Sequence, residues 1–188
     1  IGTGPIFVLC WLMFTDVAIS RWLAALVPLV ITLQFALVGW GVIKDEAAVK
    51  AMSRTGDPRE ILRGPLFYGI VFVAMTLIYW KDSLIGIPAL MILCGGDGIA
   101  DIVGRRVKSR RWFWSPEKSV AGSLSVFLGG WLLTMFIFTI YVWMGAFSGP
   151  TTRFIVALAA TLIESLPFKD IDNITIALAC ALIGYLVF

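Results

Sequence analysis

Long blocks of apolar residues alternate with short polar segments along most of the chain. Most blocks approach the roughly 20 residues that an α-helix needs to cross the hydrocarbon core of a bilayer. Lipid offers the backbone no hydrogen-bond partner, so such blocks cross it as helices. The pattern predicts about seven helices, near residues 5–15, 21–43, 65–80, 83–103, 122–145, 151–167 and 173–188.

The composition excludes an ordinary soluble domain. Apolar residues make up 60% of the chain and charged residues 14%, against about 45–50% and 25% in soluble proteins. We therefore expect a single all-α domain over residues 1–188, a polytopic transmembrane helical bundle held in the lipid bilayer. The first helix is short and the chain opens at Ile1 without a methionine, so we interpret the sequence as an N-terminally truncated piece of a longer protein.

Basic residues gather on one predicted face of the membrane. Alternating helix directions put the loops 44–64, 104–121 and 168–172 on the same face. These loops hold all of the 15 Lys and Arg residues except Arg21, Lys81 and Arg153. By the positive-inside rule this face lies in the cytosol or an equivalent compartment such as the stroma. Acidic residues lie on this face as well, which favours a functional site over a basic patch that only anchors the protein to lipid.

Cysteine and histidine usage excludes several kinds of site. Cys10, Cys94 and Cys180 lie inside apolar runs without paired spacing, which favours helix packing over disulfides or a zinc site. The sequence has no histidine, so neither a histidine-based triad nor a histidine-ligated metal is available within it.

The stretch 94–106 carries the most informative acids. Asp97 and Asp101 are four positions apart, so on a helix both carboxylates point the same way. Neighbouring anions at the end of an apolar span repel each other unless a cation or a phosphate-bound Mg²⁺ lies between them. Mg²⁺ binds through one or two carboxylates plus substrate phosphates. We expect these acids to hold Mg²⁺; the alternative is a structural ion pair with Arg105 or Arg106.

Three glycines surround the first of these acids. Gly95, Gly96 and Gly98 remove side chains where the backbone must approach either a ligand or another helix. The basic run that begins at Arg105 and Arg106 offers charge to a triphosphate, although basic residues at helix ends are usually signals of membrane orientation.

A second polar stretch, residues 115–123, precedes the next predicted helix. Lys118 offers a positive charge to phosphate, while Ser119 and Ser123 flank a helix start whose free N–H groups attract anions. This arrangement predicts a phosphate-binding turn unlike the Walker A pattern. The alternative is that Ser119 only caps the helix and Lys118 is a solvated flank.

Two further segments return to the same face. Glu164 lies within or beside hydrocarbon, where an ionisable residue is a functional candidate, and Asp172 and Asn173 open the last predicted helix. The alternative is a structural hairpin in which Glu164 pairs with Lys169. In the loop 56–65, Glu60 and Arg63 either contact the substrate or form a structural side-chain pair on a helix.

One membrane-edge site with acids, a lysine, serines and glycines suits the phosphates of a nucleotide and a lipid alcohol. Phosphoryl transfer depends mainly on positioning and charge neutralisation. In this scheme Asp97 and Asp101 hold Mg²⁺, Lys118 and an arginine neutralise phosphate, and one of the carboxylates accepts the alcohol proton.

In combination these motifs resemble the phytol kinase branch of the polyprenol and dolichol kinase family. The matching pieces, in order, are Gly56–Leu66, Cys94–Arg106, Lys118-Ser119 with Ala121–Ser123, Glu164–Pro167 and Asp172-Asn173. The resemblance implies a transmembrane kinase domain that uses CTP, or another nucleoside triphosphate, to phosphorylate an isoprenoid alcohol. The expected reaction converts phytol to phytyl phosphate for tocopherol synthesis.

The motifs and the resemblance together assign roles and partners. Expected catalytic residues are Asp97, Asp101, Lys118, Glu164 and Asp172, and expected nucleotide-binding residues are Gly95, Gly96, Gly98, Arg105, Arg106, Lys118, Ser119, Gly122, Ser123 and Asn173. The partners implied are an isoprenoid alcohol, a nucleoside triphosphate and the lipid bilayer, with no nucleic acid. The expected location is the chloroplast envelope or another plastid membrane, with the endoplasmic reticulum as the alternative.

Other functions stay open at this point. Farnesol and geranylgeraniol kinases are similar at these motifs. A cytidylyltransferase or a CDP-alcohol phosphotransferase also joins acids to lipids at a membrane edge, and Asp97-Gly98 begins like the acidic signature of the latter, whose later aspartates are absent. A transporter is the non-enzymatic alternative, although the matched halves typical of transporters are not visible.

Overall fold

The computed structural model describes residues 3–15, 17–53, 55–81, 85–107, 109–113, 119–144 and 172–187. Within its helices, positions 97, 101, 105, 172, 183, 184 and 187 are described by their backbone alone. Apart from one isolated β-bridge, the regular elements of these residues are helices.

The chain order of the helices follows the predicted pattern. They are α1 (Thr3–Cys10), the 3₁₀ turn η1 (Trp11–Met13), α2 (Ser20–Gly39), α3 (Glu46–Met52), the 3₁₀ turn η2 (Pro58–Leu62), α4 (Gly64–Ile78), α5 (Gly86–Met91), the π-helix η3 (Ile92–Asp97), α6 (Gly98–Arg106), α7 (Val120–Trp143) and α9 (Asp172–Val187). Each predicted span coincides with one of these helices or a continuous run of them, except 151–167, which lies outside the described residues.

Four of these runs are long and apolar enough to cross a bilayer. They are Ser20–Gly39, Pro58–Ile78, Gly86–Gly104 and Val120–Trp143, and the shorter apolar helices are Thr3–Met13 and Asn173–Leu182. The predicted class, an all-α polytopic transmembrane bundle, is confirmed. The short first helix also agrees with the sequence pattern.

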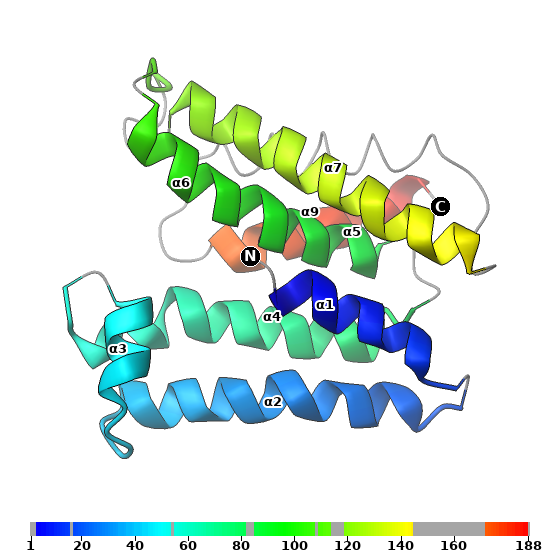
Figure 1. The fold of residues 1–188 in the computed structure, drawn as a ribbon, viewed down its shortest axis with the longest axis horizontal. Helices are drawn as coiled ribbons and strands as arrows, with labels where there is room; N and C mark the ends of the chain where they lie inside the picture. Colours follow the sequence, from blue (N-terminus) through cyan, green and yellow to red (C-terminus); the bar gives the residue numbers. More distant parts are fainter. Residues whose placement is uncertain are drawn as a thin grey trace.

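The continuous helix α5–η3–α6 is the centre of the bundle (Figure 1). Its span Gly86–Gly104 is 69% buried, whereas the other three spans are 33% to 39% buried and present more of their surface to lipid. α5 packs against α1, α4, α7 and α9, and η3 packs against α7 and α9. The helix that carries the two predicted acids is therefore the core helix of the fold.

Glycines on both helices allow the close crossing of η3 and α7. A Cβ atom on Gly96 would lie 2.9 Å from the carbonyl oxygen of Val126, and one on Gly129 would lie 2.8 Å from the carbonyl oxygen of Gly95. Small residues let helix backbones approach closely in membranes, where packing drives helix association. The helical conformation predicted around Asp97 is present, but it reaches that residue as a π-helix, a wider turn often found at functional sites.

Polar contacts join the outer helices to this core. The hydroxyl of Tyr141 in α7 donates to the carbonyl oxygen of Val8 in α1 over 2.8 Å. The hydroxyl of Tyr68 in α4 lies 3.0 Å from the Sγ atom of Cys94 in η3. None of the three cysteines forms a disulfide; Cys94 and Cys180 are buried as packing residues, whereas Cys10 is exposed on α1.

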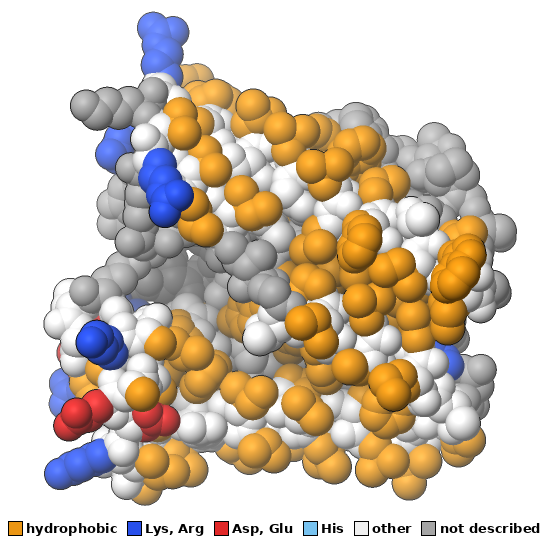
Figure 2. Space-filling view, viewed as in Figure 1, with side chains coloured by type: hydrophobic (Ala, Val, Ile, Leu, Met, Phe, Trp, Pro, Cys, Tyr) orange, Lys and Arg blue, Asp and Glu red, His pale blue; other side chains and the backbone are white. Residues whose placement is uncertain are grey.

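The polar helix ends share one end of the bundle. Figure 1 shows the last residues of α2 and α6 and the first residues of α4, α7 and α9 at the same end. Charged side chains gather at that end, and hydrophobic side chains cover the flanks (Figure 2). The alternation of helix directions predicted from the sequence holds for the described spans.

The loop 44–64, expected to be irregular, contains two short helices. Asp45 caps α3, because its Oδ1 atom accepts from the N–H of Ala48 over 2.9 Å. Asp57 caps η2 in the same way, accepting from the N–H of Arg59 over 2.9 Å. Side-chain caps of this kind stabilise helices too short to show apolar periodicity.

A valine at the helix crossing tests its tightness. The Gly96→Val variant should lower the free energy of unfolding by about 1–3 kcal/mol, because added methyl groups overpack a filled contact. Thermal unfolding of the purified protein in detergent measures the change. Gly64→Ala is the control, since a Cβ there meets no atom within 4 Å; equal unfolding midpoints for both variants would refute the tight crossing.

Candidate functional site

The two acids lie inside the central span, near its polar end. Asp97 is the last residue of η3 and Asp101 belongs to α6, and both precede Gly104, where the apolar span ends. At a rise of about 1.5 Å per residue, Asp97 lies about 10 Å and Asp101 about 5 Å from that end along the helix. Ionisable residues at such positions are functional candidates.

Binding of Mg²⁺ by these acids stays a prediction. Among the residues whose side chains are described, no group of three or more His, Cys, Asp or Glu side chains could hold a metal ion. The side chains of Asp97 and Asp101 lie outside that set. Their backbone places them one α-helical turn apart, and the common direction of the two carboxylates stays a prediction.

Gly95 and Gly96 have a packing role. Both are buried against α7, which is the helix-packing alternative, and the predicted contact with nucleotide stays a prediction. Gly98, half-buried at the start of α6, and the exposed Arg106 at its end lie nearer the polar end of the helix. Arg105 lies there by its backbone position.

Ser119 is the N-cap of α7. Its Oγ atom accepts from the N–H of Gly122 over 3.1 Å, and its carbonyl oxygen accepts from the N–H of Ser123 over 3.0 Å. Ser119 therefore caps the helix, and the rest of that alternative, which concerns Lys118, lies outside the described residues. The same hydroxyl lies against α6, because a Cβ on Gly104 would be 3.6 Å from it, so the cap also joins the ends of α6 and α7.

The segment 109–113 covers the start of α7. Arg111 forms an antiparallel bridge with Ser119, and the carbonyl oxygen of Arg110 accepts from the N–H of Val120 over 2.9 Å. The Oγ atom of Ser109 accepts from the N–H of Ala121 over 3.1 Å. The segment thus places one backbone acceptor and one side-chain acceptor against the first turn of α7.

The expectation of free N–H groups at this helix start is wrong. Each of the N–H groups of residues 120–123 has a partner within the protein. The hydroxyl of Ser123 also accepts, from the indole N–H of Trp112 over 3.0 Å. A phosphate here must therefore be held by side chains and by the helix dipole, which favours negative charge at this end. In the sequence, the basic and aromatic run after Arg106 was the only sign that a segment packs against this helix start.

The start of α9 is joined to the start of α4. The side-chain N–H of Asn173 donates to the carbonyl oxygen of Gly64 over 2.9 Å, although 109 positions separate the two residues. Asp172 is the first residue of α9. The predicted convergence of the 172–173 and 56–66 motifs on one face is confirmed for these residues.

Glu60 has a structural role in the 55–60 turn. Its carboxylate accepts from the hydroxyl of Thr55 over 2.9 Å and from the N–H of the same residue over 3.3 Å. Gly56 lies between them with a φ of +86°, a conformation that glycine adopts without strain. The carbonyl oxygen of Glu60 also accepts from the N–H of Arg63 over 3.2 Å, so the turn fixes the residues that lead into α4.

Other predicted site residues lie outside the described part of the chain. These are Lys118 and Glu164, together with Lys169, the alternative partner of Glu164. Their proposed roles in neutralising phosphate, accepting a proton or pairing across a hairpin stay predictions.

The fold and the site define a helical membrane protein with its polar motifs at one membrane face. The chain is 38% identical over 193 residues to a protein from Triticum aestivum named probable phytol kinase, chloroplastic, covering 99% of this chain and 64% of that one. It is 41% identical over 194 residues to the farnesol kinase, chloroplastic, of Arabidopsis thaliana, covering 100% and 63%. It is 37% identical over 193 residues to phytol kinase 1, chloroplastic, of Arabidopsis thaliana, covering 99% and 64%.

The chain is thus a homologue of proteins named phytol kinase and farnesol kinase, and the resemblance found in its motifs is confirmed. It spans 63% to 64% of the length of these relatives. No family model matches the sequence, and no solved structure matches it significantly.

Substitutions at Ser119 test the cap. Ser119→Ala should lower the free energy of unfolding by about 1 kcal/mol, because the N–H of Gly122 loses its acceptor. Ser119→Asp should retain the stability of the unsubstituted protein, since aspartate caps equally well. Thermal unfolding in detergent measures both variants. A Ser119→Asp protein as unstable as Ser119→Ala would contradict the capping role.

Proposed function

We propose that this protein transfers the γ-phosphoryl group of CTP, or of another nucleoside triphosphate, to the hydroxyl group of an isoprenoid alcohol. The observation that carries the proposal is the 37% to 41% identity, over nearly the whole chain, to proteins named phytol kinase and farnesol kinase. The one-sided polar face and the acid-bearing central helix support it.

The position of the acids suits two substrates of opposite solubility. A nucleoside triphosphate arrives from water, whereas the chain of an isoprenoid alcohol stays in the bilayer. Asp97 and Asp101 lie within the last part of the span Gly86–Gly104, where a hydroxyl at the membrane edge and a phosphate from water can meet. Such a site catalyses transfer mainly by holding both reactants in line and neutralising charge.

Each residue is proposed for the role that its side-chain chemistry suits. Asp97 and Asp101 supply oxygen ligands one helical turn apart, a donor set that fits Mg²⁺. When bound there, Mg²⁺ supplies positive charge to the phosphate oxygens. Lys118 and the arginines that follow α6 add further positive charge. A carboxylate among Asp97, Asp101, Glu164 and Asp172 accepts the proton of the alcohol.

The bonded start of α7 supports phosphate binding by side chains. Because the N–H groups of residues 120–123 already have partners, charged side chains are the donors proposed for phosphate at this end. Arg106 and Arg110 are exposed beside it. Arginine matches phosphate geometry with two parallel donors, so these residues suit a triphosphate.

The proposed substrate and location are taken from the names of the relatives. Phytol is the proposed alcohol, with phytyl phosphate as product for tocopherol synthesis, and farnesol and geranylgeraniol are the alternatives. A chloroplast envelope or another plastid membrane is the proposed location, since these relatives carry the word chloroplastic in their names. The enzymatic alternatives are a cytidylyltransferase, which transfers a cytidylyl group from CTP, and a CDP-alcohol phosphotransferase, which transfers the phosphoalcohol group of a CDP-alcohol and releases CMP.

A labelled nucleotide separates these reactions. Membranes containing the protein are incubated with γ-labelled CTP and with phytol, farnesol or geranylgeraniol. The proposal predicts label in the phosphorylated lipid. Release of diphosphate with formation of a CDP-lipid would instead identify a cytidylyltransferase.

Two substitutions connect this activity with the site. Asp97→Asn and Lys118→Ala should each lower alcohol phosphorylation about a hundredfold or more, because each removes charge stabilisation of the transferring group. Glu46→Gln is the matched control, since this exposed acid of α3 lies on the same face and outside the matching motifs. Wild-type rates for Asp97→Asn or Lys118→Ala would contradict the assigned roles.

A further inference from the structure

Asn173 joins two of the sequence motifs at the polar end of the bundle. Its side-chain N–H donates over 2.9 Å to the carbonyl oxygen of Gly64. Gly64 is the first residue of α4 and directly follows Arg63, which ends the turn η2. Asp172, the first residue of α9, directly precedes Asn173. The hydrogen bond therefore brings the backbone of Arg63 close to that of Asp172.

The α9 side of this bond is anchored in the core. The residues three, four and seven positions after Asn173 share its side of the helix. These residues are Ile176, Ala177 and Cys180, and all three are buried in the core cluster together with residues of α5 and η3. α9 also packs directly against η3, whose last residue is Asp97. The side chain of Asn173 thus starts from a fixed part of the fold, next to the helix that carries the predicted acids.

The α4 side of the bond is exposed. Residues 64–68 are each partly exposed, and the first buried residue of α4 is Gly69. A Cβ on Gly64 would meet no atom within 4 Å, and Arg63 is exposed. The amide of Asn173 therefore supplies a directional contact where side-chain packing is sparse. Loss of this amide should move the start of α4 and leave the start of α9 in place.

We propose that Asn173 is a positioning residue that holds Arg63 in the substrate site beside Asp172. The inference rests on the proposed function and adds Arg63 as a residue that binds phosphate, with Asn173 acting through it. Arginine matches phosphate with two parallel donors, and Asp172 is one of the carboxylates proposed to accept the alcohol proton. Displacement of a reacting group by about 1 Å can cost about a hundredfold in rate.

Removal of the amide tests this role kinetically. Asn173→Ala should lower kcat for alcohol phosphorylation about tenfold and change the KM for CTP less than about threefold, because it displaces a charge without removing a contact to the nucleotide. Gln34→Ala is the matched control: the side-chain N–H of Gln34 joins α2 to Asp45 over 3.3 Å at the same face and outside the matching motifs, and its loss should leave kcat unchanged. A raised KM for CTP at unchanged kcat in Asn173→Ala would overturn the proposal.

A double-mutant cycle separates positioning from general destabilisation. If Asn173 acts through Arg63, then Asn173→Ala should lower kcat less than about twofold in the Arg63→Ala background, because the group that it positions is already gone. An undiminished tenfold loss in that background would overturn the proposal.

Cross-linking tests the placement without requiring turnover. In a protein with Cys10→Ser, the pair Arg63→Cys and Asp172→Cys should be joined by a short bifunctional maleimide, as measured by mass spectrometry of the linked peptides. The yield should fall several-fold when Asn173→Ala is added. Equal yields with and without this amide would overturn the proposal.

The two kinds of readout distinguish the placement from the reaction. Cross-linking that depends on Asn173 in a protein that phosphorylates no alcohol would support the placement and refute the kinase. An active kinase whose cross-linking is independent of Asn173 would refute the placement alone.

Discussion

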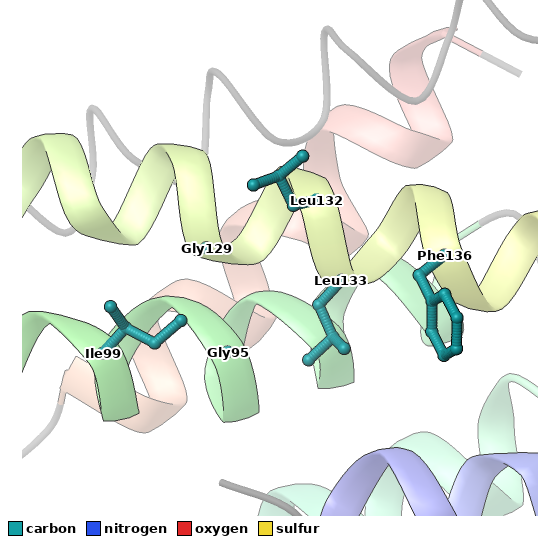
Figure 3. A pocket seen from close by; sticks show the side chains of 6 residues that line it. All are labelled: Gly95, Ile99, Gly129, Leu132, Leu133 and Phe136. Carbon is teal, nitrogen blue, oxygen red and sulfur yellow. The ribbon is translucent and has the colours of Figure 1, made fainter.

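The close crossing of η3 and α7 is the contact on which the rest of the structure depends. Four glycines, Gly95, Gly96, Gly129 and Gly130, allow the two backbones to meet. This crossing keeps the acid-bearing helix at the centre of the bundle, with 69% of its span buried. A shallow apolar groove lies along the same crossing (Figure 3). One packing contact therefore keeps the helix that carries the predicted acids at the centre of the bundle.

The polar face is organised by side chains that satisfy helix ends. Ser119, Ser109 and Trp112 bond the first turn of α7, while Asn173 joins α9 to α4. These contacts join the start of α9 to the start of α4, and the segment after α6 to the start of α7. They also occupy the donors that a bare helix start would offer to phosphate, so the proposed binding of a triphosphate depends on lysine and arginine side chains. The proposed kinase activity thus depends on charged side chains around a helix start whose N–H groups already have partners within the protein.

The sequence was informative where local chemistry decides the structure. Long apolar blocks predicted the spans, and alternation of their directions predicted that Asn173 would return to the face of the 56–66 loop. It was uninformative where distant contacts decide. The bonding of the first turn of α7 depends on Trp112 reaching Ser123, and the close helix crossing depends on glycines that meet across two helices. The short helix α3 was missed because seven residues are too few to show a clear period.

The central claim is that the polar helix ends open on one membrane face. Cysteines introduced at Lys50 and Arg110, and at Met144 beyond the other end of α7, test it in sealed vesicles after replacement of the exposed Cys10; these three positions are all exposed. A membrane-impermeant maleimide should label positions 50 and 110 from the same side and position 144 only from the opposite side. Labelling of positions 50 and 110 from opposite sides would contradict the account.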